Sequence, residues 1–206
     1  MTTVVADIKK GRKFDQVLEG ARYIFMRDGF EGASVDDIAR AAGVSKATLY
    51  SYFPDKRLLF SEVARIECNR QAEAALKELY ALDTIEAVLH DAANVMVRFF
   101  LSDFGQQMYR ICVAESHRFP ELGGRFYSSG PELAKVRLSG VFGRFVDEGR
   151  LDIPDMDLAT SQFCELCKSD LFVRAICNVE YDATDTQIER VVQGVVDMFM
   201  ARYGRG

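Results

Sequence analysis

The sequence of 206 residues predicts an all-α protein. Apolar residues recur at three- and four-residue intervals along most of the chain, and no segment shows the strict alternation that is typical of a half-buried strand. Residues that begin or end helices stand between these periodic segments, namely serines that can cap an N-terminus and glycines that can end a helix. Together these observations predict helices joined by short turns.

The first 60 residues contain the clearest helix boundaries. Ser34-Val-Asp-Asp37 resembles a capping box, and Pro54 suits the first turn of a helix. The predicted helices and their boundary residues are about 12 to Arg27 ended by Gly29, 35–42 between Ser34 and Gly43, about 46–53 after Ser45, and one that begins at Pro54. This order predicts short capped helices before longer ones.

Longer helices are predicted in the remainder of the chain. Their approximate ranges are 55–80, 83–101, 104–118, 124–149 with a break or bend around Gly130-Pro131, 155–179 and 184–203. The segment 117–132 is rich in turn signals and gives the weakest pattern. No repeat or low-complexity segment interrupts these helices.

Charge and composition narrow the class of protein. Residues 1–60 hold 10 Lys and Arg against 8 Asp and Glu, whereas residues 61–206 hold 16 against 23. Basic residues gather near the N-terminus, at Lys9, Lys10, Arg12 and Lys13. No apolar run approaches the roughly 20 residues that span a bilayer, and the N-terminus lacks the order of a secretory signal. We therefore expect a soluble cytoplasmic protein. The charge balance argues against a general polyanion binder and leaves room for a local basic surface.

The short helix after Ser45 has two different faces. Leu49 and Phe53 lie one turn apart and can pack on the preceding helix, whereas Ala47 points to the opposite side, flanked by Thr48 and Tyr50. A small central residue lets a helix approach a DNA major groove, and hydroxyl groups at its edges can bind phosphates. Two helices joined by the tight Ala-Gly-Val-Ser turn predict a helix-turn-helix.

A family resemblance supports this prediction. The segment from Phe14 to Phe60 resembles the DNA-binding domain of the TetR family of bacterial regulators, over about a quarter of the chain. The matching residues are Ala21, Phe25, Gly29-Phe30, Ser34-Val35, Ile38-Ala39, Ala42-Gly43-Val44-Ser45, Thr48-Leu49-Tyr50, Tyr52-Phe53, Lys56 and Leu59. The sequence departs at Ala47, where glycine is common in the family, and alanine is harmless in a helix.

The residues expected at the DNA are Ser34, Ser45, Lys46, Ala47, Thr48, Tyr50, Tyr52 and Lys56. Free N–H groups at the helix starts near Ser34 and Ser45 can bind phosphates. By the resemblance, Ser34 and Tyr50 contact phosphates, and Lys46, Ala47 and Thr48 approach bases or the nearby backbone. The resemblance also implies that Tyr52 and Lys56 hold the backbone on the far side, and it suggests a phosphate or minor-groove contact for Arg12 and Lys13.

Apolar stripes near the C-terminus predict a dimer. The last helix carries a continuous apolar stripe, and the segment 155–179 is apolar nearly all round, so we expect it to be buried on two sides. The expected interface residues are Phe172, Ile176, Val191, Val192, Val195 and Phe199. Gly194 would permit a close helix crossing. The resemblance implies a four-helix bundle formed by the last two helices of each subunit; a monomeric core is the alternative.

Residues 96–145 are rich in aromatic and sulfur-containing side chains, which suit an adaptable apolar cavity. The residues expected to line a ligand pocket are Met96, Phe100, Phe104, Met108, Cys112, His117, Phe126, Phe142 and Phe163. Ordinary core packing is the alternative for each of them. The stretch from Cys112 to Leu122, with Phe126 and Gly130-Pro131-Glu132, resembles the C-terminal domain of an AefR-like TetR subgroup.

Other chemistry has little support in the sequence. Cys164 and Cys167 share a helix face, but a closed zinc site needs about four ligands, and His90 and His117 are distant. Five cysteines, an odd number, favour free thiols over a disulfide framework. No phosphate-binding glycine loop, nucleophile elbow or His-x-x-x-His pair is present. We therefore expect no enzyme, no cofactor and no metal.

The sequence thus predicts two domains. Residues 1–55 form a three-helix DNA-binding domain, and residues 56–206 a larger helical domain for ligand binding and dimerisation. The predicted function is a homodimeric repressor that binds a palindromic operator in double-stranded DNA and is released by a small apolar or amphipathic effector. Two alternatives stay open, namely a helical carrier protein without DNA readout and a regulator that senses oxidants through thiols.

Overall fold

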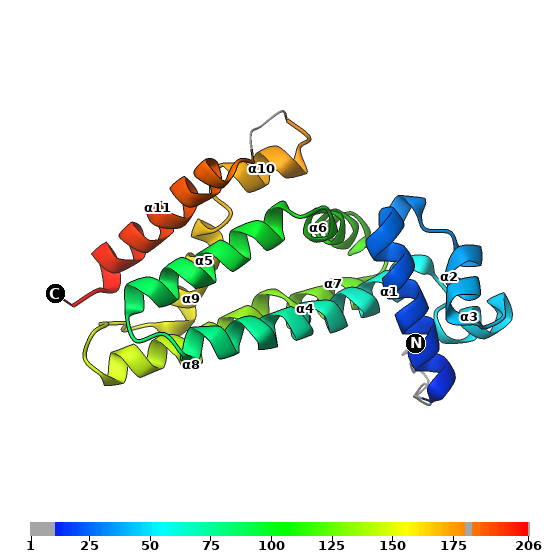
Figure 1. Cartoon of the computed structure of the whole chain (residues 1–206), viewed down its shortest axis with the longest axis horizontal. Helices are drawn as coiled ribbons and strands as arrows, with labels where there is room; N and C mark the ends of the chain where they lie inside the picture. The colour runs from blue at the N-terminus through cyan, green and yellow to red at the C-terminus, as the bar shows by residue number, and fades with distance from the viewer. Residues whose placement is uncertain (1–10, 180–182, 206) are drawn as a thin grey trace. The chain divides into compact units, whose positions relative to one another are not determined.

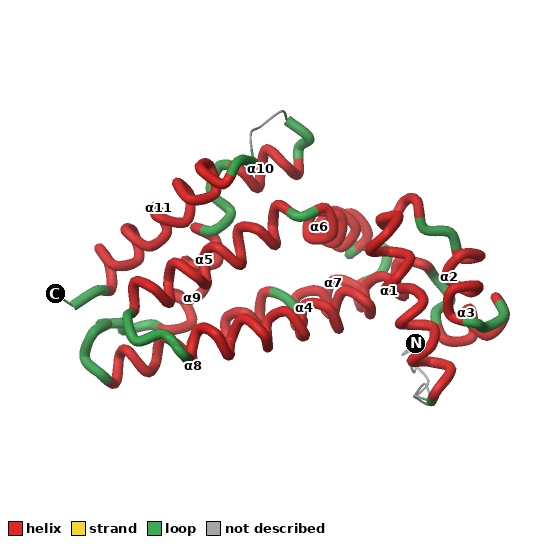
Figure 2. The backbone as a smooth tube through the Cα atoms, viewed as in Figure 1, coloured by secondary structure: helices red, strands yellow, loops and turns green. Residues whose placement is uncertain are grey.

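The computed structural model describes residues 11–179 and 183–205, which contain eleven α-helices and no strand (Figures 1 and 2). An isolated antiparallel bridge between Leu151 and Gly204 joins two loops in this part of the chain. The all-α prediction is confirmed. The basic residues Lys9 and Lys10 lie outside the described residues.

The chain divides into two compact units, residues 1–66 and 67–206. The division falls within one continuous helix, α4, which runs from Lys56 to Tyr80 and contributes to both units. The domain boundary predicted from the sequence, between residues 55 and 56, lies at the start of this helix.

The first unit contains α1 (Arg12–Gly32), α2 (Val35–Ala42), α3 (Lys46–Tyr52) and the beginning of α4. Its core is built on the apolar faces of these helices, from the buried residues Phe14, Val17, Ala21, Ile24, Phe25, Ile38, Leu49, Phe53, Leu59 and Phe60. The rings of Phe25, Phe30 and Phe60 contact one another, with centroids 5.0 to 6.1 Å apart. The core contacts α3 along one face of the helix through Leu49, and the opposite face stays outside the core.

Glycine permits two features of this unit. A Cβ atom at Gly20 would lie 2.6 Å from the backbone nitrogen of Ala42, so α1 and α2 approach closely only because that atom is missing. At Gly29 the backbone turns to a φ of 69°, as its predicted role in ending the first helix requires. Three further residues then resume a helical turn, so α1 extends to Gly32 rather than ending near Arg27.

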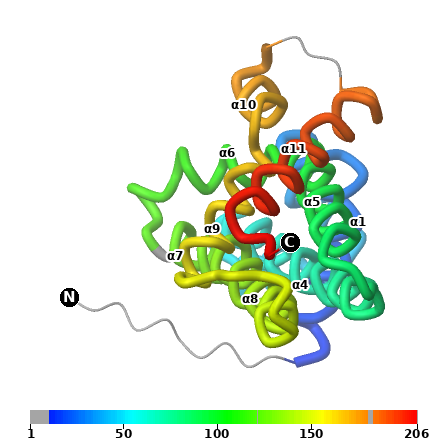
Figure 3. Tube along the Cα trace, turned by 90° about the vertical axis from the view of Figure 1, so that its left-hand side faces the viewer, coloured from blue at the N-terminus to red at the C-terminus, as the bar shows by residue number. Residues whose placement is uncertain are grey.

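The second unit contains the rest of α4 and seven more helices. These are α5 (Ile85–Leu101), α6 (Asp103–Glu115), α7 (Pro120–Ser129), α8 (Pro131–Asp147), α9 (Met156–Leu166), α10 (Leu171–Ile176) and α11 (Asp185–Tyr203). Helices α5 and α11 lie side by side, and α8 packs on α9 (Figures 1 and 3). An aromatic series of Phe142, Phe163, Phe199 and Tyr203 fills the centre of the core.

The prediction of one helix over 155–179 is wrong. The helix stops at Leu166, and the backbone of Asp170 has a φ of 59°, a conformation that Asp tolerates better than most residues. The Ser169 hydroxyl donates to the Leu166 carbonyl at 2.6 Å, and Asp170 forms an ion pair with Arg174 on α10. The bond from the Ser169 side chain to the backbone and the positive φ of Asp170 therefore favour a turn, and α9 and α10 are separate helices despite the apolar periodicity.

The turn-rich segment around 117–132 is more helical than predicted. Helix α7 already begins at Pro120, where proline fits a first helical turn, rather than near residue 124. The predicted break at Gly130-Pro131 is confirmed, because Gly130 leaves the helical conformation and Pro131 begins α8.

Candidate DNA-binding surface

The turn between α2 and α3 is set by one glycine and one serine. Gly43 ends α2 with a φ of 63°, and the next N–H, of Val44, donates to the Ala39 carbonyl at 3.1 Å. The hydroxyl of Ser45 accepts the N–H of Thr48 at 3.1 Å and so begins α3. The predicted pair of short helices with a tight turn is present in the first unit.

The inner face of α3 is part of the core. Leu49 is 1% exposed and Phe53 4% exposed, and the ring of Phe53 stacks on that of Phe14 with centroids 5.5 Å apart. The ring of Tyr52 meets Phe14 edge-on at 5.6 Å and is half-buried. Tyr52 therefore has a packing role here, and its contact with a DNA backbone stays a prediction.

The outer face of α3 is small, polar and exposed. Ala47 and Ser51 are exposed, and the Tyr50 side chain has an exposed fraction of 47%. Thr48 is half-buried, with its hydroxyl oxygen 2.9 Å from that of Ser45, while Ser51 donates to the Thr48 carbonyl at 2.7 Å. Of the α3 residues that the sequence predicts at DNA, Ala47, Thr48 and Tyr50 thus lie on or beside this face, whereas Tyr52 packs on Phe14.

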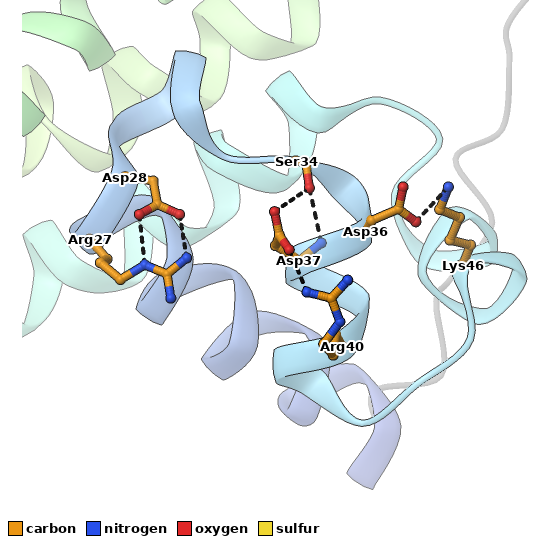
Figure 4. A network of polar contacts seen from close by, with 7 residues as sticks. All are labelled: Arg27, Asp28, Ser34, Asp36, Asp37, Arg40 and Lys46. Carbon is orange, nitrogen blue, oxygen red and sulfur yellow. Dashed lines mark hydrogen bonds and ion pairs between the residues drawn. The ribbon is translucent and has the colours of Figure 1, made fainter.

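Charged groups of α2 and of the start of α3 form polar contacts (Figure 4). The Nζ atom of Lys46 lies 2.5 Å from an Asp36 carboxylate oxygen. Ser34 caps α2 by accepting the N–H of Asp37 at 3.0 Å, and its hydroxyl donates to the Asp37 carboxylate at 2.6 Å. The hydrogen bond from Ser34, followed by the ion pair with Arg40, lowers the pKa of Asp37. A phosphate at Ser34 would have to replace Asp37 as the acceptor.

Lys56 has partners inside the first unit. Its ammonium group donates to the carbonyls of Phe30 at 2.8 Å and Ala33 at 3.1 Å, and it lies 4.2 Å from the Phe30 ring centroid. These carbonyls belong to the end of α1, where a positive charge is favourable. Lys56 therefore holds α1 against the start of α4, a role that the sequence did not reveal, and its phosphate contact stays a prediction.

The predicted pocket residues of the second unit separate into two groups. Phe142 and Phe163 are fully buried and contact each other and Phe199, so they are core residues in this structure. A second aromatic group connects four helices. The Phe172 ring contacts Phe100 and Tyr109, and Tyr109 contacts Phe126, with centroids 5.1 to 6.3 Å apart.

The other predicted pocket residues differ in exposure. Met108 and Cys112 on α6 are buried, Met96 and Phe104 are half-buried, and His117 is exposed. Tyr109 and Phe172 complete the aromatic group but are absent from the predicted pocket set. The sequence predicted Phe172 at the dimer interface instead, since the break before α10 was not expected.

The predicted interface stripe is not exposed. Val191, Val192, Val195 and Phe199 are at most 7% exposed in a single chain, because they face the core that contains α5. Phe172 is likewise buried and Ile176 half-buried. Val191, Val192, Val195, Phe199 and Phe172 are therefore core residues of the single chain, and their role in a dimer stays a prediction.

A surface groove that the sequence did not suggest lies between α5 and α11. It is lined by Glu86, Ala87, His90, Gln193, Val196, Asp197 and Met200. The ring of His90 lies 2.9 Å from the carboxylate of Glu189 and 3.4 Å from that of Asp91, and the hydrogen bond with Glu189 raises the pKa of His90. His90 and Glu189 are 99 positions apart, so no local sequence pattern could have paired them.

The cysteines do not form a recognisable reactive centre. All five are free thiols, and no group of three or more possible metal ligands occurs among the described residues. Burial raises the pKa of Cys164 to about 11, and burial likewise raises the pKa of Cys167. No helix in the described parts of the chain is long and apolar enough to cross a membrane.

Comparison with known proteins agrees with this geometry. Residues 17–63 match the model of bacterial regulatory proteins of the tetR family, and residues 87–205 match the C-terminal domain of AefR-like transcriptional repressors. A curated relative is the biofilm operon icaADBC HTH-type negative transcriptional regulator IcaR of Staphylococcus aureus, 23% identical over 147 residues, which are 69% of this chain and 74% of IcaR.

Solved structures are similar over nearly the whole chain. A TetR-family transcriptional regulator from Mesorhizobium loti has a TM-score of 0.80 and 25% identity, covering 94% of this chain and 98% of its own. The flavonoid-responsive regulator FrrA has a TM-score of 0.67 and 33% identity with the same coverage. Because the AefR-like model alone matches more than half of the sequence, the chain belongs to the TetR family of bacterial DNA-binding transcriptional regulators.

Proposed function

We propose that the protein is a repressor that binds a palindromic operator as a homodimer and is released by a small aromatic effector. The observation that carries the DNA contact is the outer face of α3, where Ala47 leaves the helix backbone accessible between Thr48 and Tyr50. Such a face fits a major groove, and hydroxyl groups beside it fit the phosphates. Repression is supported by IcaR, which is named a negative regulator.

Ala47→Glu tests the DNA contact. Glutamate is a good helix former and position 47 is exposed, so folding should be unaffected, while a carboxylate would meet the base edges and phosphates. We expect the variant to lose about 1,000-fold or more in affinity for DNA that the wild type selects from a random pool, which is the lower end of the difference between specific and non-specific binding. Fluorescence anisotropy measures it.

The control is Val136→Glu on α8, where the native side chain has an exposed fraction of 65% and the charge change is the same. It should bind the selected DNA like the wild type. If Ala47→Glu also binds normally, α3 does not enter the groove. If the wild type selects no DNA but binds small apolar molecules, the carrier hypothesis is the better one.

The effector is proposed to be planar and aromatic. Phe100, Tyr109, Phe126 and Phe172 present ring faces and edges from four helices, which suits stacking with another ring. The similarity to FrrA, a flavonoid-responsive regulator, supports the same class of ligand. Flavonoids carry fused and linked aromatic rings with hydroxyl groups.

Hydrogen bonds of Arg110 join α6 to α10 beside these rings. The guanidinium of Arg110 donates to the carbonyls of Ala175 at 2.7 Å and Ile176 at 3.2 Å, while the neighbouring Tyr109 ring contacts Phe172. A ligand that enters the aromatic group would separate α6 from α10. The effector can change DNA affinity only if it binds one conformation of the protein better than the other. Helix α4 is part of both units and could transmit the change from the second unit to the first.

Titration with a panel of flavonoids and simple phenols tests this part of the proposal. A matching compound should release the selected DNA, and Phe126→Leu should require more of it, whereas Tyr127→Leu, at a more exposed ring on the same helix, should not. Release that is equally efficient with both variants would place the effector elsewhere.

The proposed dimer surface is the outward face of α11. A Cβ atom at Gly194 on this face would meet no other part of the described chain within 4 Å, and Met198, one turn later, has an exposed fraction of 60%. Ala201 is exposed on the same face. A glycine costs about 1 kcal/mol inside a helix, and a close crossing with a second copy of α11 would offset that cost.

A further inference from the structure

The ion pair between Lys46 and Asp36 joins two helices at the DNA-facing surface (Figure 4). Lys46 is the first residue of α3, and Asp36 lies in the first turn of α2. Their side chains have exposed fractions of 53% and 58%, so water and DNA reach both. The lysine expected to contact DNA thus already has an anionic partner within its own chain.

The neighbouring carboxylate has different partners. Asp37 accepts bonds from the Ser34 hydroxyl and the Arg40 guanidinium, and its backbone N–H is capped by Ser34. Asp37 is therefore held within α2. Asp36, one residue earlier, instead reaches across to α3, so the two adjacent acidic residues have separate roles.

We propose that Asp36 competes with DNA for Lys46 and thereby sets the operator affinity below the value that α3 alone would give. The inference rests on the proposed DNA contact of α3. A phosphate or a guanine edge would bind the same ammonium group, and a carboxylate held beside that phosphate would repel it. Binding therefore exchanges the partner of Lys46 from Asp36 to DNA.

The size of the effect follows from the exposure of the pair. Exposed ion pairs are weak, so the exchange lowers DNA affinity by about two- to fivefold and does not prevent binding. A moderate affinity has a consequence for regulation, because an effector can shift the equilibrium only by its own differential affinity for the two states. Because Asp36 weakens DNA binding, an effector with a smaller difference in affinity between the two states is sufficient to release the DNA.

A double-mutant cycle tests the competition directly. Wild type, Asp36→Asn, Lys46→Gln and the double variant are titrated with DNA selected by the wild type, at one fixed salt concentration. Asp36→Asn should raise affinity about two- to fivefold when Lys46 is present, plus any general effect of the lost charge. In the Lys46→Gln background only the general effect should remain. The ratio of the two changes isolates the competition.

A matched control removes the same charge elsewhere. Asp28 on α1 is bound by its neighbour Arg27 at 2.6 Å, so Asp28→Asn should show the same effect with and without Lys46. Equal effects of Asp36→Asn in both backgrounds would leave only long-range charge and overturn the proposal. A fall in affinity with Asp36→Asn would also overturn it, since Asp36 would then orient Lys46 or contact DNA itself.

The two proposals fail in distinguishable ways. If the wild type binds its selected DNA, Ala47→Glu does not, and the cycle shows no coupling, only the competition is refuted. If Ala47→Glu binds as tightly as the wild type, the proposed DNA contact of α3 is refuted and the competition with it. Thermal unfolding of each variant checks that the exposed substitutions leave the fold intact.

Discussion

At the scale of single residues, burial controls the chemistry of the cysteines. Burial raises the pKa of Cys68 to about 12 and that of Cys112 to about 11, and the pKa of Cys164 is raised similarly. Only the thiolate is a good nucleophile, so these thiols are unreactive near neutral pH. Cys177, by contrast, is exposed.

We therefore expect an alkylating reagent at pH 7 to modify Cys177 first in the native protein. The buried Cys112 and Cys167 should react only after denaturation, and the half-buried Cys68 and Cys164 should react more slowly than Cys177. Peptide mass spectrometry over time distinguishes the sites. If Cys164 reacted as fast as Cys177, burial would not protect it and the thiol-sensor hypothesis would regain support.

His90 makes stability depend on pH. Its hydrogen bond with Glu189 raises the pKa of His90 in the folded state, so folding favours the charged ring. The stabilisation is complete below the unfolded pKa of about 6.5 and is lost as the pH rises through the higher folded pKa. Glu189→Gln should lower the melting temperature more at pH 6 than at pH 8.5. Glu78→Gln on α4 serves as the exposed control. If Glu189→Gln lowered the melting temperature equally at both pH values, the stability would not be linked to the charge of His90.

At the scale of elements, the crossing of α1 and α2 depends on Gly20. A methyl group there would meet the Ala42 backbone at 2.6 to 2.7 Å, so the helices must move apart. Gly20→Ala should lower the free energy of unfolding by about 1–3 kcal/mol, the usual cost of overpacking. Urea denaturation measures it. Gly124→Ala, with open space at a helical site, should be neutral or stabilising, and similar losses in both variants would indicate a different cause.

The contacts of Lys56 also belong to the scale of elements. Because its ammonium group binds two carbonyls at the end of α1, Lys56→Ala would remove both a structural bond and any phosphate contact. A loss of DNA binding in that variant would have two explanations. Exposed positions such as Ala47 therefore give the clearer tests of DNA contact.

At the scale of the whole molecule, the proposed dimer explains why α11 exposes Gly194 and Met198 while its apolar stripe faces inward. Met198→Glu should place two like charges near the symmetry axis and raise the dimer dissociation constant at least about tenfold. Sedimentation equilibrium measures it. Val136→Glu on α8 is the matched control, and dissociation in the control but not in Met198→Glu would move the interface to α8.

The sequence alone determined the all-α class, the helix-turn-helix and its family, because caps, glycines and periodicity act over a few residues; it did not reveal the break between α9 and α10. Gly43, Ser45, Leu49 and Phe53 are examples whose local pattern fixes turn, cap and inner face. Only the tertiary structure decided which apolar stripes are core, since burial of Val192 and Phe199 depends on distant α5. The pairs Lys46–Asp36, Lys56–Phe30 and His90–Glu189 also depend on the tertiary structure. No local sequence pattern predicts that these residues meet.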